Sequence, residues 1–230
     1  MKTIGLLGGM SWESTELYYR LINEGVKGRL GGLNSAKIAL VSVNFSEIES
    51  LQHRGDWDRA GEVLAAAAQR VEAAGADFLL ICTNTMHKVA PQIEAAISIP
   101  LLHLADATAQ RIKGQGLKKV GLLGTKFTME EDFYRGRFQE HGLEVVVPPP
   151  EDRQIVHQII YDELCLGKVR DASRKEYLRI MGQMKAQGAQ GIIEGCTEIA
   201  LLVGQQHTDI ALFDTTSIHA EEAVKLALAP

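Results

Sequence analysis

Two residues suited to proton transfer stand at matching places in this chain. Cys196 follows a short apolar run, and Thr83 follows a similar run earlier in the sequence. These two residues are 113 positions apart, and Gly75 and Gly188, which precede the same runs, have the same separation. A thiol and a hydroxyl on opposite sides of one small molecule could remove a proton from one face and return a proton to the other.

A second recurrence supports a duplicated half-molecule. The segment at residues 2–8 returns at residues 119–124, with its central glycines 116 positions apart. Two copies of one unit would place Thr83 and Cys196 at equivalent strand ends. If the two copies close on each other, these side chains face one another across a cleft.

The position of Cys196 predicts a reactive thiol. A cysteine between a strand end and a helix N-terminus has its thiolate favoured by backbone N–H groups and by the helix dipole, so we expect its pKa to fall below the free value of about 8.5. The same N–H groups, with threonine and asparagine side chains, form a pocket of the size of a carboxylate. The sequence contains no phosphate-binding loop, and Gly5, Gly8 and Gly9 lack the dinucleotide-binding spacing, so we expect no nucleotide cofactor.

The composition argues against several classes of partner. A formal net charge of −5 does not fit a nucleic-acid-binding surface. No stretch approaches about 18 uninterrupted apolar residues, so no membrane partner is expected. The N-terminal apolar run is interrupted by two glycines and is too short for a secretory signal. Three cysteines without metal-like spacing fit reduced thiols, so we expect a cytoplasmic protein without a bound metal.

Apolar runs of strand length alternate with helical segments along the chain. Eight segments have the length and composition of strands: residues 3–7, 38–43, 78–82, 99–104, 120–123, 144–147, 191–194 and 210–213. The alanine-rich segment 58–74 predicts a helix, 125–141 predicts another, and 45–54 predicts a loop with one helical turn. Because the strands are continuous apolar runs, we predict an α/β fold in which helices cover both faces of parallel sheets.

We expect two similar α/β domains related by a pseudo-twofold repeat. The first would comprise residues 1–104 plus 210–230, and the second residues 105–209. Ligands of such sheets bind beyond the carboxyl ends of the strands, where small polar residues gather in this sequence. The active site is therefore expected in the cleft between the domains.

Three motifs resemble those of the aspartate/glutamate racemase family: GGMSWEST at residues 8–15, CTNTMH at 82–87 and GCTE at 195–198. The resemblance spans the whole chain and is closest to the branch of aspartate racemases and broad-specificity amino-acid racemases. It implies two homologous domains that hold an amino acid between two cysteines, one at a strand end in each domain. One cysteine removes the α-proton and the other protonates the opposite face, without pyridoxal phosphate or a metal. The resemblance also implies a homodimer and favours aspartate or glutamate as the substrate.

The chain departs from the family's pattern on one side. The family's first cysteine directly precedes Asn-Thr, but here Thr83 occupies that place and Cys82 lies one residue earlier. Because neighbouring side chains on a strand point to opposite faces, we expect Cys82 to lie in the core and Thr83 to form the acid–base pair with Cys196. A threonine hydroxyl is a much weaker acid than a thiol, so its proton must be restored through water, His87 or a neighbouring amide.

The remaining site residues follow from the resemblance and from the repeat. The expected substrate ligands are Met10 (through its backbone), Gln52, Asn84, Thr85, Lys168, Thr197 and Glu198. Gln52, with Arg54 close by, stands where the family often has an arginine for the side-chain carboxylate. Hydrogen bonds from an amide would recognise that carboxylate less strictly than a bidentate ion pair, which allows glutamate or a wider range of substrates. Glu198 could bind the substrate ammonium.

Alternatives remain open at the level of the sequence. Hydantoin racemases and maleate isomerases also use cysteines in a cleft but act on other substrates. A binding protein that senses an amino acid is a third possibility, since the cysteine pair is incomplete. His87 follows Thr83 by one helical turn and could orient a water or only pack. Cys165, at an apolar helix end, is expected to be structural.

Overall fold

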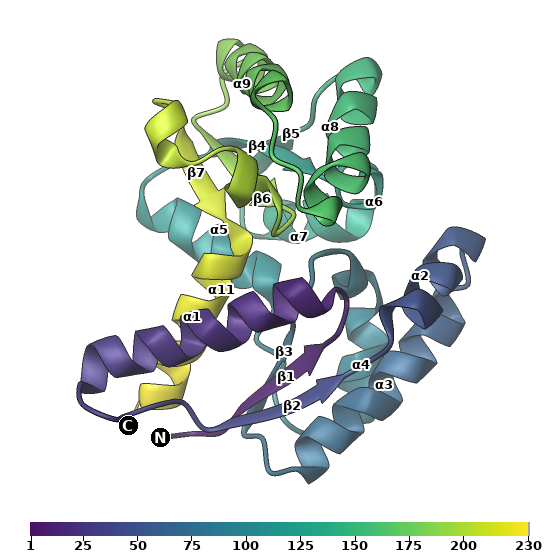
Figure 1. The fold of residues 1–230 in the computed structure, drawn as a ribbon, viewed down its shortest axis with the longest axis vertical. Coiled ribbons are helices and arrows are strands. Elements are labelled where there is room, and N and C mark those ends of the chain that lie inside the picture. The colour runs from purple at the N-terminus through teal and green to yellow at the C-terminus, as the bar shows by residue number, and fades with distance from the viewer. Residues whose placement is uncertain (230) are drawn as a thin grey trace. The chain divides into compact units, whose positions relative to one another are not determined.

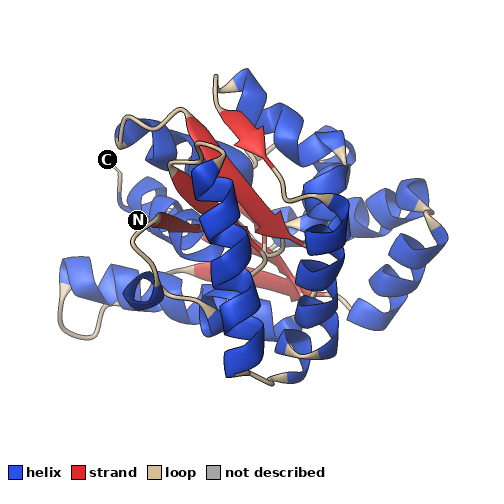
Figure 2. Cartoon of the chain, turned by 90° about the horizontal axis from the view of Figure 1, so that it is seen from above, coloured by secondary structure: helices blue, strands red, loops and turns tan. Residues whose placement is uncertain are grey.

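The computed structural model describes residues 1–229, and the chain divides into two compact units. Unit 1 comprises residues 1–104 together with the chain from His219 onward, and unit 2 comprises residues 105–218. Each unit contains one parallel β-sheet with helices on both of its faces (Figure 1, Figure 2). The predicted α/β class is therefore confirmed.

The sheet of unit 1 has three strands in the order β2-β1-β3. They are β1 (Ile4–Gly8), β2 (Ile38–Ser42) and β3 (Phe78–Ile81). All residues of β1 and β3 are buried, as expected for apolar strands that are covered on both faces. A parallel bridge between Leu79 and Leu101 stands where a fourth strand would lie.

The helices of unit 1 form two layers. They are α1 (Trp12–Leu30), α2 (Phe45–Arg54), α3 (Trp57–Ala73), the 3-10 helix η1 (Thr85–Val89) and α4 (Ala90–Ala96). One face of the sheet packs against α2, α3 and α4, with Leu64 and Ala68 of the alanine-rich α3 in that core. The other face packs against α1 and the last turns of α11, through residues such as Tyr18 and Val224.

The sheet of unit 2 has four strands in the order β5-β4-β6-β7. They are β4 (Lys119–Gly124), β5 (Glu144–Val146), β6 (Gly191–Gly195) and β7 (Ala211–Asp214). The helices are α5 (Leu104–Gly114), α6 (Lys126–Glu130), α7 (Asp132–Glu140), α8 (Pro150–Asp162), η2 (Leu164–Leu166), α9 (Asp171–Ala186), α10 (Ile199–Leu202), η3 (Gln205–His207) and α11 (Thr215–Leu228). Residues of α8 and α9 form one core with the face of β6 that carries Ile192.

The two units share one topology. In each, the first strand in sequence pairs with the second strand on one side and the third strand on the other. The bridge at Leu101 in unit 1 takes the place that β7 takes in unit 2. This agreement supports the duplication that the repeated sequence segments indicated.

Several local predictions differ from the structure. Residues 45–54 form the regular helix α2 and not a loop, because Asn44 caps its first turn and Gly55 ends it in the left-handed region at φ 69°. Residues 99–104 make only a single bridge. The predicted helix at 125–141 is interrupted at Glu131, which has an extended backbone.

The boundary near the C-terminus also differs from the expected one. Residues 210–218 belong to unit 2, because β7 pairs in parallel with β6 from Gly191↔Ala211 to Glu194↔Asp214. Only the part of α11 from His219 onward returns to unit 1.

Candidate active site

The glycine-rich loop after β1 forms a tight turn in unit 1. Gly9 has φ 91°, and a Cβ at this position would lie 2.2 Å from the carbonyl oxygen of Val43, so only glycine fits. The Gly9 N–H donates to Thr15 Oγ1 at 2.8 Å, and the Ser11 side chain caps the start of α1. Met10 is buried, with its side chain in the core, so the loop presents backbone at this position.

The strand β3 leads directly into the Thr83 segment. Cys82 is fully buried in the core between the sheet, α1 and α11, as predicted, and burial raises the pKa of its thiol far above the ordinary value. Thr83, the next residue, is only partly buried. The backbone here is held from two sides, because Ser14 Oγ donates to the Cys82 carbonyl at 3.0 Å and the His87 ring contacts the Thr83 carbonyl.

His87 makes hydrogen bonds to the backbone through both ring nitrogens. Its Nε2 accepts from the Leu104 N–H at 3.3 Å, so Nδ1 carries the proton and donates to the Thr83 carbonyl at 2.8 Å. The ring is thus held neutral and is engaged with the carbonyl of Thr83, whereas the reactive group of that residue is its hydroxyl. His87 could orient a water or only pack, and this geometry favours packing.

Three of the expected substrate ligands lie together in unit 1. Asn84 is buried and Thr85 is partly buried at the start of η1, directly after Thr83. Gln52, near the end of α2, is also buried, and its Nε2 lies 2.8 Å from Met86 Sδ. The fold therefore brings the amide of Gln52 next to the loop that follows β3.

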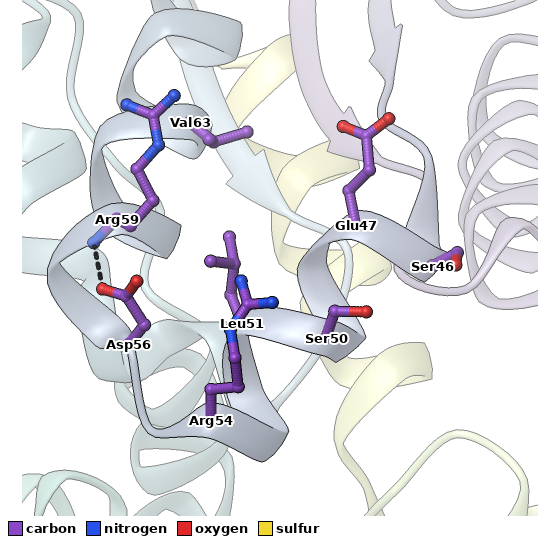
Figure 3. Close-up of a pocket in the computed structure, with 8 residues that line it drawn as sticks. All are labelled: Ser46, Glu47, Ser50, Leu51, Arg54, Asp56, Arg59 and Val63. Atoms are coloured by element: carbon purple, nitrogen blue, oxygen red, sulfur yellow. Dashed lines mark hydrogen bonds between the residues drawn. The ribbon is translucent and has the colours of Figure 1, made fainter.

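Arg54 lies apart from Gln52, in an open pocket of about 440 Å³ between α2 and α3 (Figure 3). The pocket is lined by Ser46, Glu47, Ser50, Leu51, Arg54, Asp56, Arg59 and Val63. Figure 3 shows acidic and basic side chains around it, and the Arg59 N–H donates to Asp56, which caps α3. None of the predicted catalytic or substrate-binding residues lines this pocket, so it is not the candidate active site.

In unit 2, Cys196 follows β6 as Thr83 follows β3. The thiol is partly buried and donates a hydrogen bond to Glu198 Oε2 at 3.0 Å. Burial, followed by the charge of Glu198 and this hydrogen bond, raises the pKa of the thiol well above its ordinary value. The prediction of a lowered pKa was therefore wrong. The helix after Cys196 has only four residues, and its dipole is opposed by a carboxylate two residues along.

Of the other residues predicted in unit 2, Thr197 has a polar partner, whereas Lys168 and Cys165 are exposed. Thr197 Oγ1 lies 3.2 Å from Thr216 Oγ1, so its hydroxyl is held beside the start of α11. Lys168 is exposed, directly after the left-handed Gly167 that ends η2. Cys165 is exposed as well, so its predicted packing role is not supported.

Two buried ionisable residues were not singled out from the sequence. Glu194 in β6 is 2% exposed, and burial together with the charge of Asp214 raises its pKa to about 8. His219 in α11 is fully buried in unit 1, and burial lowers its pKa to about 3. A single acidic residue inside the apolar run of β6 was the available signal for Glu194.

The described residues form neither a metal-binding cluster nor a membrane-spanning helix. Within residues 1–229, no group of three or more His, Cys, Asp or Glu side chains is arranged to hold a metal ion. In the same part of the chain, no helix has the length and apolar character needed to cross a membrane.

Comparison with known proteins gives matches along nearly the whole chain. The model of the Asp/Glu/hydantoin racemase family matches residues 7–223. The broad specificity amino-acid racemase RacX of Bacillus subtilis strain 168 is 24% identical over 231 residues, which are 98% of this chain and 98% of the relative. A crystal structure of a candidate Asp/Glu racemase from Yersinia pestis is 57% identical, with a TM-score of 0.95. An aspartate racemase homologue from Pyrococcus horikoshii OT3 is 33% identical, with a TM-score of 0.89. Both structural matches cover 100% of both chains.

Proposed function

The chain belongs to the Asp/Glu/hydantoin racemase family, and we propose that it interconverts the L and D forms of an acidic amino acid with Cys196 and Thr83 as its acid–base pair. In this family the reaction needs no cofactor, and we propose the same for this chain. The observation that carries the proposal is the equivalence of the two residues. Each is partly exposed. Cys196 directly follows β6 and Thr83 lies two residues beyond the end of β3, and each of these strands pairs beside the first strand of its unit.

The proposed reaction removes a proton from one face of the α-carbon and adds a proton to the opposite face. The Cys196 thiolate removes the α-hydrogen as a proton, and the electron pair of the C–H bond is left as a carbanion stabilised by the carboxylate. The Thr83 hydroxyl then donates its proton to the opposite face. This leaves a Cys196 thiol and a Thr83 alkoxide. Before the next turnover Thr83 must regain a proton from solvent, and the carboxyl group that took the first thiol proton must release it.

In this proposal Glu198 accepts the first proton, which comes from the Cys196 thiol. The Cys196 thiol already donates to Glu198 Oε2 at 3.0 Å, so the carboxylate is positioned to take the proton and leave the thiolate. The raised pKa of the thiol makes this assistance necessary at neutral pH. We therefore expect the enantiomer whose α-hydrogen faces Cys196 to react faster in initial-rate assays, although the equilibrium between enantiomers stays at one to one.

Substrate recognition is proposed to use hydrogen bonds more than ion pairs. Asn84, Thr85, Lys168 and the backbone of Met10 would bind the substrate carboxylates. Glu198 would bind the ammonium group, and Thr197 is a further substrate ligand. Gln52 would meet the side-chain carboxylate. An uncharged amide discriminates less strongly than arginine, so we propose that both aspartate and glutamate are accepted.

A second candidate function is supported by the weakness of the acid–base pair. Thr83 replaces a cysteine, and the pKa of the Cys196 thiol is raised. A chain with these two features could bind an amino acid without turning it over. Such a binding protein would retain affinity for the ligand and would show no exchange at the α-carbon.

The decisive experiment follows solvent deuterium into the α-position of L- and D-aspartate and of L- and D-glutamate. The racemase proposal expects deuterium uptake together with loss of optical rotation, and it expects Cys196→Ala to abolish both. Thr83→Cys should retain or raise the rate, whereas Thr83→Ala should exchange the α-proton without inverting the centre. Binding without any exchange would instead support the second candidate, and a 5-substituted hydantoin in the panel tests the related racemase activity.

Exposed apolar side chains on α1 bear on how the chain assembles. Trp12, Tyr19 and Leu30 are exposed on α1 at spacings of 7 and 11 residues, close to whole turns, and they form one apolar row on the helix. We propose that this row contributes to a homodimer in the cytoplasm, where the free thiols would stay reduced. Trp12→Glu should shift the mass measured by light scattering from dimer to monomer if the row is buried in the interface.

A further inference from the structure

Glu194 is a buried carboxyl group that the proposed reaction does not use. It lies in β6, is 2% exposed, and its Oε1 atom has no hydrogen-bond partner within the described residues. A buried carboxylate without partners is unfavourable, whereas a protonated carboxyl is tolerated much better. The site therefore favours the neutral acid.

The neighbouring carboxyl group shows the opposite arrangement. Asp214 stands beside Glu194 in the parallel register of β6 and β7. Its carboxylate accepts from the N–H groups of Thr216 and Ser217 at 3.0 and 3.4 Å and from Ser217 Oγ at 2.5 Å. These donors and the start of α11 would stabilise a negative charge at this position. Burial, followed by the charge of Asp214, raises the pKa of Glu194 to about 8.

The other groups around Glu194 are apolar or weakly acidic. On the other side of β6, Leu123 of β4 stands next to Glu194 in register. Tyr177 of α9 is the titratable group that interacts with Glu194 from the covering helices, and Val156 and Ile160 of α8 line the same core. No cation is among these neighbours, so none of them offsets the charge of an ionised Glu194.

Glu194 in β6 and Cys196, the first residue after that strand, lie on the same side of the chain. Side chains two positions apart on a strand point the same way, about 6.6 Å apart along it. Cys196 packs against the same core as Ile192, which confirms that the alternation continues through Glu194. A charge on Glu194 would therefore act on the Cys196 thiol at short range.

We propose that Glu194 is a positioning residue that controls the proton of Cys196, because its ionisation adds a second negative charge beside a thiol already facing Glu198. While Glu194 is neutral, one carboxylate acts on the thiol and can accept its proton. Once Glu194 ionises, the thiolate is opposed by two carboxylates and the thiol keeps its proton. This inference rests on the proposed function of Cys196 and gives the reaction an alkaline limit.

The repeat indicates that the acid is not required for folding. The residue 113 positions earlier, Ile81 in β3, occupies the equivalent place in unit 1 and is fully buried. An apolar side chain therefore fits this position in the shared topology. Glu194→Leu is a useful second variant beside the isosteric Glu194→Gln.

The test measures the reactivity of the thiol and does not depend on turnover. In the full chain carrying Cys165→Ser, which removes the exposed thiol, the rate of Cys196 alkylation by iodoacetamide is followed by peptide mass spectrometry from pH 6.5 to 9.5. Glu194→Gln should match the parent at pH 6.5, where Glu194 is neutral. At pH 9.5 it should react about tenfold faster, the size expected for one nearby charge in a partly screened site. Glu144→Gln, which removes an exposed carboxylate on β5, should match the parent throughout.

The alkylation profiles decide whether Glu194 controls the thiol. Superimposed alkylation profiles of folded Glu194→Gln and the parent would overturn the inference, and Glu194→Leu provides the same comparison if the glutamine variant does not fold. A faster alkaline reaction in either variant supports it. If that difference is seen but no α-deuterium is incorporated, the racemase proposal fails and the control of the thiol by Glu194 stands.

Discussion

At the scale of single residues, the protonation of Cys196 is set by burial and by the carboxylate of Glu198, and not by the helix that follows it. The four residues of α10 offer a short dipole, whereas Glu198 accepts a hydrogen bond from the thiol at 3.0 Å. Both the charge and the hydrogen bond stabilise the protonated form. A thiol held in this way carries a proton that it can donate. Before it can accept a proton from the substrate, a base must first remove its own proton.

This arrangement predicts opposite effects of Glu198→Gln on reactivity and on catalysis. Removing the charge lowers the pKa of Cys196, so alkylation by iodoacetamide at pH 8 should be several-fold faster in a Cys165→Ser background. Racemisation should nevertheless fall by about 10²-fold, because the group that takes the thiol proton is lost. The two rates are measured by mass spectrometry and by chiral chromatography.

Glu176→Gln is the matched control for this prediction. It removes a half-buried carboxylate from α9 that pairs with Arg179, and it should leave both rates unchanged. Slower alkylation in Glu198→Gln would contradict the assigned role of the carboxylate.

At the scale of elements, the loop after β1 depends on one backbone conformation. Gly9 combines φ 91° with a close approach to the Val43 carbonyl at the end of β2. The loop thereby brings the backbone at Met10 to the carboxyl edge of the sheet. No side chain can substitute without moving β2 or the start of α1.

Gly9→Ala should therefore destabilise unit 1 strongly. We expect a loss of about 3 kcal/mol or more, from the disfavoured φ and from the clash with the carbonyl of Val43. Urea unfolding followed by tryptophan fluorescence measures it, since both tryptophans lie in unit 1. Gly28→Ala, in the open on α1, should instead gain about 0.5–1 kcal/mol. Equal effects of the two substitutions would refute the argument.

The contact between α1 and α11 includes a buried polar pair. Tyr18 Oη lies 2.8 Å from His219 Nδ1, and His219 Nε2 lies 2.7 Å from the Leu102 carbonyl. A neutral imidazole satisfies both contacts when Nε2 donates to Leu102 and Nδ1 accepts from Tyr18. The pair thus fixes where the last helix docks on unit 1.

Tyr18→Phe should cost about 1–3 kcal/mol of unfolding free energy, because it leaves the acceptor nitrogen of a buried histidine without its donor. The shift in the urea midpoint measures this loss. Tyr19→Phe, one residue along and exposed, provides the control and should change stability by less than about 0.5 kcal/mol. A negligible shift for Tyr18→Phe would show that the pair does not stabilise the docking of α11.

At the scale of the whole molecule, the chain crosses between its units twice in the same way. After the bridge at Leu101 it leaves unit 1 through α5, whose residues from Ala105 onward belong to unit 2. After β7 it leaves unit 2 through α11, whose residues from His219 onward belong to unit 1. The helix that follows the last sheet position of each unit thus begins in that unit and continues in the other unit. Unit 1 is therefore built from two separate segments of the chain, whereas unit 2 is the continuous segment 105–218.

The two units should respond to pH in opposite directions. In unit 1 the pKa of His219 is lowered to about 3, so its stabilising effect is present above about 6.5 and is lost as the pH falls towards 3. In unit 2 the pKa of Glu194 is raised to about 8, so its stabilising effect is present below about 4.5 and is lost as the pH rises towards 8. Each effect is on the order of a few kcal/mol.

Hydrogen exchange across pH 4 to 9 measures both responses, since it reports on β1 and β6 separately. Protection of β1 should fall in acid, and His219→Gln should weaken that dependence. Protection of β6 should fall in alkali, and Glu194→Gln should weaken that dependence. A pH response of β6 that is unchanged by Glu194→Gln would contradict the assignment of its cause.

Much of the fold was determined locally by the sequence. Apolar runs without alternation predicted parallel strands, the alanine-rich segment predicted α3, and the matching positions of Thr83 and Cys196 predicted equivalent strand ends. Alternation on a strand also placed Cys82 in the core. These features follow from the periodicity and composition of short segments, which a chain carries before it folds.

Other features were decided only by contacts between distant segments. The assignment of β7 depends on its pairing with β6, and the neutral state of His87 depends on Leu104. The pKa of Glu194 depends on burial and on Asp214 across the ladder. The raised pKa of Cys196 depends chiefly on burial, a property of the assembled core and not of its neighbours in sequence. Charge and hydrogen-bond energies depend on distance in space and on exclusion of water, so only the tertiary structure could determine the protonation of these groups.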